Sequence, residues 1–127
     1  MERRLAAIMF TDIVGYTALM GESEAKGLRA RERHRALVRP LVETYHGEAI
    51  EARGDESLAV FPTALDAVNC ALAIEETLAG DGELRLHIGI HTGDIVVENG
   101  EVTGDAVNIA ARIRSFAESG VCVSGEV

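Results

Sequence analysis

The spacing of apolar and polar residues divides the first third of the chain into a strand and a helix. Residues 3–14 are almost continuously apolar after two arginines, which predicts a strand in the centre of a sheet. A helix is expected from Ser23, whose hydroxyl can cap it, to about residue 46, because apolar residues recur there at helical spacing. Pro40 lies inside this pattern and predicts a kink or a break near Arg39.

The middle of the chain is predicted to form a hairpin, a second helix and two further strands. Short apolar segments at 49–52 and 58–61 flank a polar turn, which is typical of a β-hairpin. Residues 63–79 have the clearest amphipathic pattern in the chain and predict a helix. Residues 84–97 indicate a pair of strands that bends at Gly93.

The last part of the chain adds one helix and one strand. Gly104 and Asp105 open a helix over 106–117, and an apolar segment at 120–124 is the final strand. The resulting order, β-α-β-β-α-β followed by α-β, begins with the ferredoxin-like arrangement. We therefore predict an α+β fold in one domain over residues 1–127. Its ferredoxin-like sheet has helices on one face and is extended by the αβ elements.

Composition narrows the class of protein. With 127 residues, 47% of them hydrophobic and 26% charged, the chain is long enough for one globular domain with its own core. Its formal net charge of −9 argues against binding to nucleic acid or to an anionic membrane. Cys70 and Cys122 have no C-x-x-C spacing and are predicted to be reduced core residues. No apolar run has the length of a membrane span or a signal peptide, so a cytoplasmic protein is expected.

Two carboxylates carry the first candidate chemistry. Asp12 lies within the apolar run of the first strand, where an unpaired charge is costly. Asp55 lies in the hairpin turn, and strands one and three are neighbours in a ferredoxin-like sheet, so the two side chains can meet at one edge. Their oxygens would suit a hard divalent cation such as Mg²⁺. The alternative is structural: Asp12 caps the turn that follows it, and Asp55 serves the hairpin.

Asn108 and Arg112 are the second candidate pair. They are four residues apart on a predicted helix and therefore share one face. Arginine can form two hydrogen bonds to a phosphate, and asparagine can orient a hydroxyl or a sugar oxygen. A solvated helix face without function explains the same spacing. Arg114 lies off this face and is predicted to point into solvent.

Four segments occur along the chain in the order FTDIVGYT, GDESLAVF, IGIHTGD and GDAVNIAARI. Together they resemble the catalytic domain of class III adenylate and guanylate cyclases, and the resemblance covers nearly the whole chain. It implies that the ribose 3′-hydroxyl of ATP or GTP attacks the α-phosphate, giving a 3′,5′-cyclic nucleotide and pyrophosphate. Two Mg²⁺ or Mn²⁺ ions per site would lower the pKa of that hydroxyl and neutralise the leaving phosphates.

The resemblance also implies roles for individual residues. Asp12 and Asp55 match the two metal-binding aspartates of the family, and the Ile13 carbonyl matches an additional ligand. Asn108 matches the residue that orients the ribose, and Arg112 matches the residue that stabilises charge on the α-phosphate. The turn that holds the terminal phosphates corresponds to Val14, Gly15, Tyr16 and Thr17.

The resemblance has a consequence for assembly. In this family the metal aspartates and the Asn/Arg pair of one active site come from different subunits. A head-to-tail homodimer with two sites at its interface is therefore implied. The family's domain also continues with further elements, including a lysine that contacts the phosphates, so residues 1–127 are expected to be a domain truncated at its C-terminus.

Some positions depart from the residues that are usual in the family. Glu51 stands four residues before Asp55, where many adenylate cyclases have lysine and guanylate cyclases have glutamate to read the base. Glu101 matches the second base-reading position of the family and is an acceptor that suits the amine of adenine; a surface role in its loop is the alternative. His87 stands where an arginine is usual, and we expect it in the core or on the sheet face. Arg85, two residues earlier, could supply the phosphate contact instead.

The sequence leads to two main hypotheses. The first is an active purine nucleotide cyclase that uses ATP, with GTP less favoured. The second is a weak or silent cyclase-homology domain that senses nucleotide or dimerises to control a neighbouring domain, as Glu51, His87 and the absent C-terminal elements suggest. A ferredoxin-like interaction domain without a nucleotide site would leave Asp12 unexplained. A diguanylate cyclase would require a GGDEF-type signature, which the sequence lacks.

Overall fold

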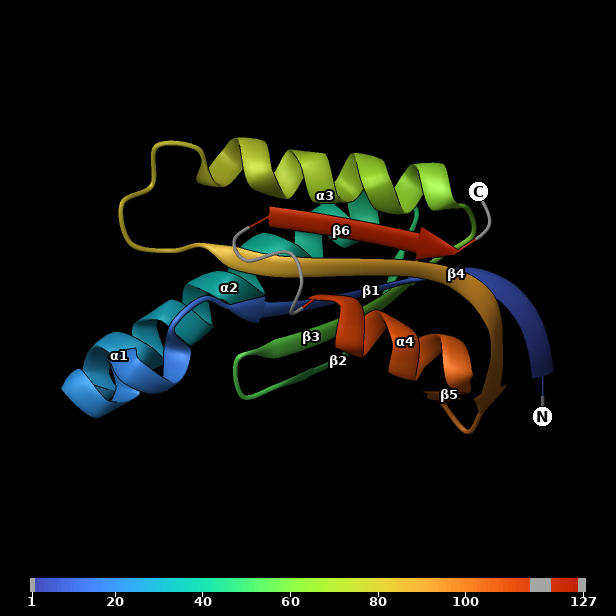
Figure 1. Cartoon of the computed structure of the whole chain (residues 1–127), viewed down its shortest axis with the longest axis horizontal. Coiled ribbons are helices and arrows are strands. Elements are labelled where there is room, and N and C mark those ends of the chain that lie inside the picture. Colours follow the sequence, from blue (N-terminus) through green and yellow to red (C-terminus); the bar gives the residue numbers. More distant parts are fainter. Residues whose placement is uncertain (1, 115–119, 126–127) are drawn as a thin grey trace.

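The computed structural model describes residues 2–114 and 120–125, and for residues 122, 124 and 125 it describes the backbone alone (Figure 1). Strands and helices follow one another in this part of the chain as an α+β arrangement. The elements are β1 (Glu2–Ile13), α1 (Tyr16–Glu22), α2 (Glu24–Thr44), β2 (Glu48–Arg53), β3 (Glu56–Phe61), α3 (Ala64–Leu78), β4 (Leu86–Glu98), β5 (Glu101–Thr103), α4 (Asp105–Ile113) and β6 (Gly120–Gly125).

The described strands form one sheet with β1 at its centre. The strand order is β2-β3-β1-β4-β5, and β6 pairs in parallel with the first half of β4. β1 pairs antiparallel with β3 and, along all of its 12 residues, with β4. The predicted pairing of the first and third strands is confirmed, and it sets Asp12 opposite Glu56. The last residues of β1, including Asp12, therefore lie beside the first residues of β4, including His87.

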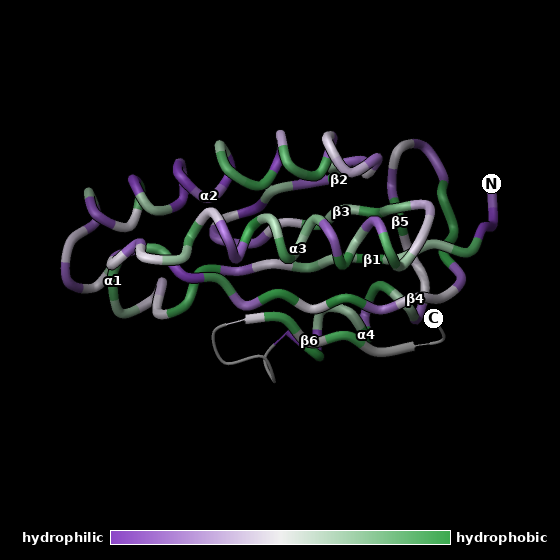
Figure 2. Tube along the Cα trace, turned by 90° about the horizontal axis from the view of Figure 1, so that it is seen from above, coloured by the Kyte–Doolittle hydropathy of each residue, from purple (hydrophilic) through white to green (hydrophobic). Residues whose placement is uncertain are grey.

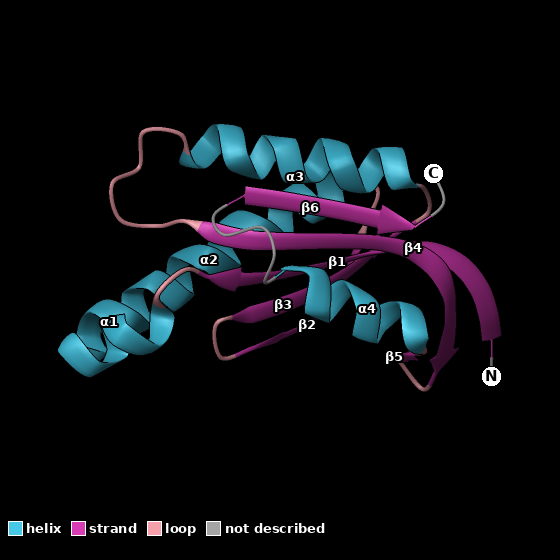
Figure 3. Ribbon diagram, viewed as in Figure 1, coloured by secondary structure: helices cyan, strands magenta, loops and turns pink. Residues whose placement is uncertain are grey.

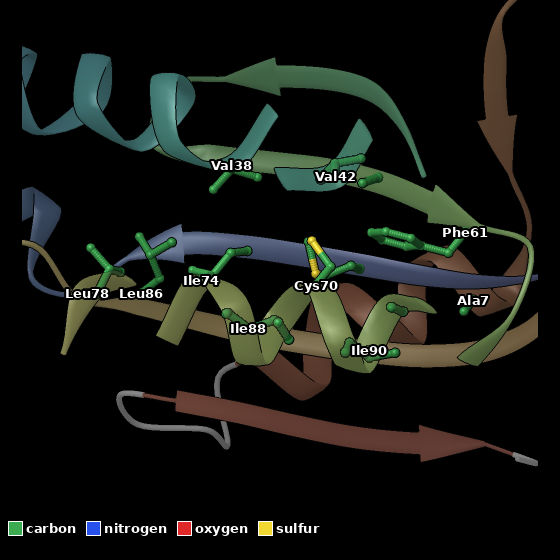
Figure 4. Close-up of a cluster of buried hydrophobic side chains, with 14 of the residues drawn as sticks. Ala7, Val38, Val42, Phe61, Cys70, Ile74, Leu78, Leu86, Ile88 and Ile90 are labelled. Atoms are coloured by element: carbon green, nitrogen blue, oxygen red, sulfur yellow. The ribbon is translucent and has the colours of Figure 1, made fainter. Parts of the chain in front are cut away.

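The main core lies between one face of the sheet and helices α2 and α3. Ala7 and Met9 of β1 point to this face, whereas Ala6 and Ile8 point to the other, as the period of two in a strand requires. Figure 2 shows hydrophilic and hydrophobic residues alternating along α2, as expected of a helix with one buried and one solvated face. Side chains from both helices and from the sheet meet in this core (Figure 4): Val38, Val42, Phe61, Cys70, Ile74, Ile88 and Ile90.

Helix α4 covers the opposite face of the sheet (Figure 3). Ala106 and Ala110 are buried there, and two glycines of β4 allow the helix to come close. A Cβ atom added at Gly89 would lie 2.6 Å from the backbone nitrogen of Arg114, and one added at Gly93 would lie 2.8 Å from the Cβ of Ala106. The predicted ferredoxin-like layer is confirmed for α2 and α3, and the added helix α4 packs on the other side.

The predicted pair of strands over 84–97 is wrong, because β4 is one continuous strand that ends at Glu98. β1 pairs with β4 from Leu86 to Val97, on both sides of Gly93, so this stretch of β4 forms its hydrogen bonds without a turn. Gly93 permits the contact with α4 instead of a reversal of the chain. The reversal comes later, at Asn99 and Gly100, which both have positive φ and connect β4 to the short strand β5.

One helix was missed, one helix prediction is wrong in part, and one is tested only in part. Helix α1 was not predicted, because it has only seven residues, no buried side chain and no side-chain cap at Gly15. Helix α2 runs through Pro40, so of the predicted kink or break near Arg39 the break is wrong and the kink stays a prediction; the start after Ser23 is confirmed. Helix α4 ends at Ile113, and the remaining residues of the helix predicted over 106–117 lie, from 115 on, outside the described part of the chain.

The predictions for the cysteines are tested for one residue. Cys70 is buried in α3 and has a free thiol, and burial raises its pKa to about 12. The side chain of Cys122 lies outside the described part of the structure. Among the described residues, no helix combines the length and the apolar character that a membrane crossing needs.

Candidate active site

The end of β1 places Asp12 on the sheet face that α4 covers. Met9 points into the main core, so Ile8 and Asp12 point to the other side. Across the sheet, Asp12 lies between Glu56 of β3 and His87 of β4. The carboxylate is partly exposed, because 22% of the side chain is accessible to solvent. An acidic residue in an apolar strand thus stands at the rim of the sheet rather than in its core.

The hairpin between β2 and β3 brings Asp55 to the same rim. Gly54, with φ of 58°, makes the turn, and Asp55 Oδ2 then accepts a hydrogen bond from the backbone N–H of Ile13 at 3.2 Å. Burial raises the pKa of Asp55, the negative charge of nearby Asp12 raises it further, and the Ile13 hydrogen bond acts in the opposite direction. The structure therefore brings together the two predicted carboxylates, which are far apart in the sequence.

Both oxygens of Asp12 have cationic or hydrogen-bonding partners. His87 Nδ1 bonds to Asp12 Oδ1, so this histidine lies on the sheet face, as expected. Arg114 Nε lies 3.2 Å from Asp12 Oδ2, and Arg114 Nη2 donates to Glu56 Oε2 at 2.8 Å. The prediction that Arg114 points into solvent is wrong, since its side chain is only 18% exposed.

The sequence does contain a signal for the position of Arg114. It follows Ala110 by four residues and Ala106 by eight, so all three lie on the same stripe of α4. Both alanines are buried against the sheet. Arg114 therefore also faces the sheet, where it contacts the carboxylates of Asp12 and Glu56.

A polar cluster behind Asp12, on the main-core side of the sheet, was not predicted. The Thr11 hydroxyl lies 2.7 Å from His34 Nε2 of α2 and also bonds to the hydroxyl of Ser57 in β3. Thr11 and His34 are fully buried. Burial lowers the pKa of His34 to about 4, with a smaller contribution from the positive charge of Arg35. This cluster joins α2, β1 and β3 next to the two aspartates.

The donor atoms at this rim fit a hard cation. Asp12 and Asp55 offer carboxylate oxygens, and Ile13, which directly follows Asp12 in the sequence, offers a backbone carbonyl oxygen. Mg²⁺ typically uses one or two protein carboxylates and completes its shell with water or substrate phosphates. Within the described ranges, no group of three or more Asp, Glu, His or Cys side chains could hold a metal. Two neighbouring carboxylates are within the number that Mg²⁺ typically takes from a protein.

The turn after Asp12 leads directly into α1. Gly15 has φ of 72°, and α1 begins at Tyr16 with no side chain capping its first turn. The backbone N–H of Val14 donates to the carbonyl of Arg85 at 2.9 Å. Arg85 is exposed and precedes β4, so it is tied to this turn through its backbone. The predicted phosphate-binding turn and the predicted extra arginine are thus neighbours.

Asn108 and Arg112 share the outer face of α4, as predicted. Both are exposed, whereas Ala106 and Ala110 on the other side of the helix are buried against the sheet. They border an open hollow on the surface together with Asp105. Within one chain, the structure does not bring this pair to Asp12 and Asp55.

Glu51 and Glu101 flank a common apolar cluster on the α4 side of the sheet. Glu51 lies opposite Leu58 of β3, and the neighbouring Ile50 packs against the cluster that contains Leu58. Val102, which follows Glu101 in β5, belongs to the same cluster. The bend of β4 thus carries β5 toward the region of β2 and β3. Both carboxylates are exposed.

Comparisons with known proteins agree with this arrangement. The family model described as the adenylate and guanylate cyclase catalytic domain matches residues 2–127. A Rhizobium meliloti protein named "Putative adenylate cyclase 3" is 37% identical over 93% of this chain and 22% of its own length. An adenylate cyclase of Streptomyces coelicolor is 35% identical over 91% of this chain and 31% of its own length. The chain therefore spans less than a third of each of these two relatives.

A solved structure shows the same fold at higher identity. The adenylate/guanylate cyclase/hydrolase from Silicibacter pomeroyi is 39% identical, with a TM-score of 0.88, over 97% of this chain and 77% of the other. A bacterial light-regulated adenylyl cyclase has a TM-score of 0.86 at 20% identity, over 98% of this chain and 77% of the other, and supports the fold alone.

Proposed function

Because the chain belongs to the family of adenylate and guanylate cyclase catalytic domains, we propose that it converts ATP into 3′,5′-cyclic AMP and pyrophosphate. GTP is the less favoured substrate. The observation that carries the proposal is the meeting of Asp12 and Asp55 at one rim of the sheet. Two relatives that are named as adenylate cyclases support ATP over GTP. We also expect a cytoplasmic location, with which the free thiol of Cys70 is compatible.

The two carboxylates and one carbonyl supply the metal-binding part of the proposal. Asp12, Asp55 and the Ile13 carbonyl would hold two Mg²⁺ or Mn²⁺ ions. Bound ions would lower the pKa of the ribose 3′-hydroxyl and neutralise the leaving phosphates. The oxygen-only donor set supports this choice, because both metals prefer oxygen ligands.

Groups around this centre would position the nucleotide. The backbone of 14–17, at the start of α1, would bind the terminal phosphates, since uncapped N–H groups at a helix start favour anions. Arg85 would add a phosphate contact from the segment to which this turn is bonded. Glu51 and Glu101 would accept hydrogen bonds from the purine, and their place beside one apolar cluster supports a shared role.

Asn108 and Arg112 would act on the substrate held by a second subunit. Asn108 would orient the ribose, and Arg112 would stabilise the charge that develops on the α-phosphate. Their exposure on the outer face of α4, away from Asp12 and Asp55 of the same chain, supports a head-to-tail homodimer. A single chain would then hold half of each of two sites.

Product formation from ATP and from GTP, measured in parallel with Mn²⁺ on the full-length protein, tests the proposal. We expect cyclic AMP as the main product. Asp55→Ala should reduce the rate by more than about a hundredfold, because it removes a metal ligand. Asp94→Ala, which removes an exposed carboxylate elsewhere on β4, is the matched control and should leave the rate unchanged.

The products separate the possible outcomes. Cyclic AMP alone would mean that Glu51 accepts adenine. Cyclic GMP alone would replace ATP by GTP in the proposal and make Glu51 the residue that reads guanine. Activity that survives in Asp55→Ala would reject the assigned metal site.

A second candidate function is a regulatory domain without turnover. One observation favours it: both oxygens of Asp12 already bond to side chains of the same chain, His87 and Arg114. Such a domain would bind nucleotide and gain thermal stability, yet form no cyclic product. Turnover that is lost in Asp12→Asn would decide against this candidate.

A further inference from the structure

Arg114 occupies a defined position among acidic groups at the end of α4. Its Nε lies 3.2 Å from Asp12 Oδ2 and its Nη2 lies 2.8 Å from Glu56 Oε2. The guanidinium carbon also lies 5.1 Å from the centre of the Phe10 ring, a distance at which a cation is attracted to the ring face. With 18% of the side chain exposed, this arginine is held on three sides.

Arg114 offsets part of the negative charge at the rim. Asp12, Asp55 and Glu56 bring three carboxyl groups to one corner of the sheet, and the charge of Asp12 contributes to the raised pKa of Asp55. A guanidinium group keeps its proton in proteins, so Arg114 supplies a permanent positive charge to this corner. In the absence of a metal, it is therefore the group that offsets the repulsion between Asp12 and Glu56.

We propose that Arg114 is a positioning residue that acts as the internal counter-ion of the metal site and competes with the divalent cation for Asp12. This inference rests on the proposed function, because it takes Asp12 and Asp55 as the metal ligands. A permanent cation that touches a ligand oxygen repels a divalent cation arriving at that carboxylate. Arg114 therefore weakens metal binding while it stabilises the metal-free chain.

Glu56 explains how the arginine gives way. It lies opposite Asp12 in the register of β1 and β3, and it receives the shorter of the two contacts from Arg114. When a cation takes Asp12, the guanidinium can leave Oδ2 and keep its hydrogen bond to Glu56 and its contact with Phe10. The same bond keeps Glu56 away from the cation. Arg114 thus gives up its contact with Asp12, keeps its contacts with Glu56 and Phe10, and does not have to move into solvent.

Direct measurement of Mn²⁺ binding tests this inference without any enzymatic readout. The dissociation constant is obtained from the electron paramagnetic resonance signal of free Mn²⁺ in the presence of the full-length protein. We expect Arg114→Gln to bind Mn²⁺ about tenfold more tightly than the wild type, the scale on which groups around the ligands change metal affinity. Arg114→Lys, which keeps the charge, should stay within about threefold of the wild type.

Two further variants define the site and control for charge. Asp12→Asn should lose the Mn²⁺ binding, which assigns the signal to this rim. Arg53→Gln also removes one positive charge from the β2–β3 hairpin, but the Arg53 side chain is 86% exposed and contacts neither aspartate in the described structure. Since exposed charges are screened, this matched control should change the dissociation constant by less than about threefold.

Thermal unfolding supplies the second readout. Without metal, Arg114→Gln should melt roughly 3–6 °C below the wild type, because carboxylates that repel one another lose their counter-ion. Saturating Mn²⁺ should then raise its melting temperature by more than it raises that of the wild type. Unchanged or weaker Mn²⁺ binding by Arg114→Gln would overturn the inference, since the arginine would then orient the ligand rather than compete with the metal.

The outcomes for the inference and for the proposed function are separable. A protein that forms no cyclic nucleotide, yet binds Mn²⁺ more tightly after Arg114→Gln, would reject the cyclase activity and retain the inference. Cyclase activity together with equal Mn²⁺ affinities of wild type and Arg114→Gln would do the reverse. Mn²⁺ binding that Asp12→Asn leaves intact would reject both the metal site and the inference.

Discussion

At the scale of single residues, the hydroxyl of Thr11 connects the two layers of the molecule behind Asp12. Thr11 bonds to His34 in α2 and to Ser57 in β3, and both Thr11 and His34 are fully buried. A buried imidazole pairs well when neutral and is costly when charged. The stability of the corner that carries the aspartates should therefore depend on the charge state of His34.

The first prediction concerns acid. Burial lowers the pKa of His34 to about 4 in the folded chain, whereas the unfolded chain has the ordinary value of 6.5. Between these two values the unfolded chain binds the proton first, so the free energy of unfolding falls as the pH falls from 6.5 to 4. The loss should reach about 3 kcal/mol below pH 4 and be absent above pH 6.5. Urea unfolding at a series of pH values measures it.

His34→Gln is the matched variant for this prediction. Glutamine can still form a hydrogen bond to Thr11 but does not titrate. The variant should be less stable than the wild type at pH 7, and the part of the pH dependence between 6.5 and 4 that is due to His34 should vanish. If the free energy of unfolding depended on pH in the same way in the wild type and in His34→Gln, a group other than His34 would be responsible.

The sequence predicted a site residue where its type is unusual for the segment around it, or where the predicted sheet sets it beside such a residue. Asp12 stands out because a carboxylate is out of place in an apolar strand. Asp55 is an ordinary turn residue by itself, and it is a candidate because the predicted sheet sets its turn beside Asp12.

His34 has no such local mark, because a polar residue on an amphipathic helix is most often solvated. The only sequence signal for Arg114 is its spacing from Ala106 and Ala110, and that signal names no partner. Their contacts arise from elements that meet only in the folded chain. The assigned roles of the site residues stay predictions.

At the scale of elements, the contact between α4 and β4 depends on two glycines. Gly89 lies beneath the end of α4, where an added Cβ would be 2.6 Å from the Arg114 nitrogen and 2.7 Å from the Ala110 carbonyl oxygen. Both are backbone atoms that cannot rotate away. The glycines of the segment IGIHTG thus have a packing role, and this role fixes the height of α4 and of Arg114 above the sheet.

The second prediction follows from this close contact. Gly89→Ala should lower the free energy of unfolding by about 2–3 kcal/mol, because the end of α4 must move away from β4. Chemical denaturation measures the loss. Gly82→Ala is the control, since an added Cβ at Gly82 meets no atom within 4 Å. It should change stability by less than about 0.5 kcal/mol. Equal effects of the two variants would contradict the packing role.

The elements that the sequence predicted well are those with a long, regular pattern. Strand β1 is almost continuously apolar, and helices α2 and α3 have apolar residues at helical spacing over many positions, so packing and propensity agree. Helix α1 has no buried residue, so its sequence lacks the periodic apolar positions that predict a helix. In β4, Gly93 resembled a turn, but pairing with β1 decided the conformation. Long-range pairing of this kind leaves no local trace.

At the scale of the whole molecule, the two faces of the sheet have different tasks. One face buries the main core under α2 and α3, and the other carries α4 with Asn108 and Arg112 on its outer side. Asp12 and Asp55 remain at the rim between them. The proposed site needs both groups of residues, so the proposal requires a second chain to complete it, and the third prediction tests this requirement.

Complementation between two inactive variants tests this premise. In a mixed dimer of Asp55→Ala and Arg112→Ala, one site carries both substitutions and the other carries neither. Co-expression of the two variants should therefore restore cyclase activity to about a quarter of the wild-type level, because half of the dimers are mixed and each has one intact site. The assay is cyclic AMP formation by the mixture and by each variant alone. A mixture as inactive as its components would argue for sites built within single chains.

The central place of β1 also sets the order in which the chain can fold. β1 is synthesised before the other strands of this sheet, yet each of its residues pairs with a residue of β4, as Ile8 does with His91. The middle of the sheet therefore cannot close until β4 has left the ribosome, and such distant pairings slow folding. Until then an apolar strand lacks a partner on that side. The start of β1 carries the charged residues Glu2, Arg3 and Arg4. Charged residues that flank an apolar strand reduce its aggregation with other chains while it is unpaired.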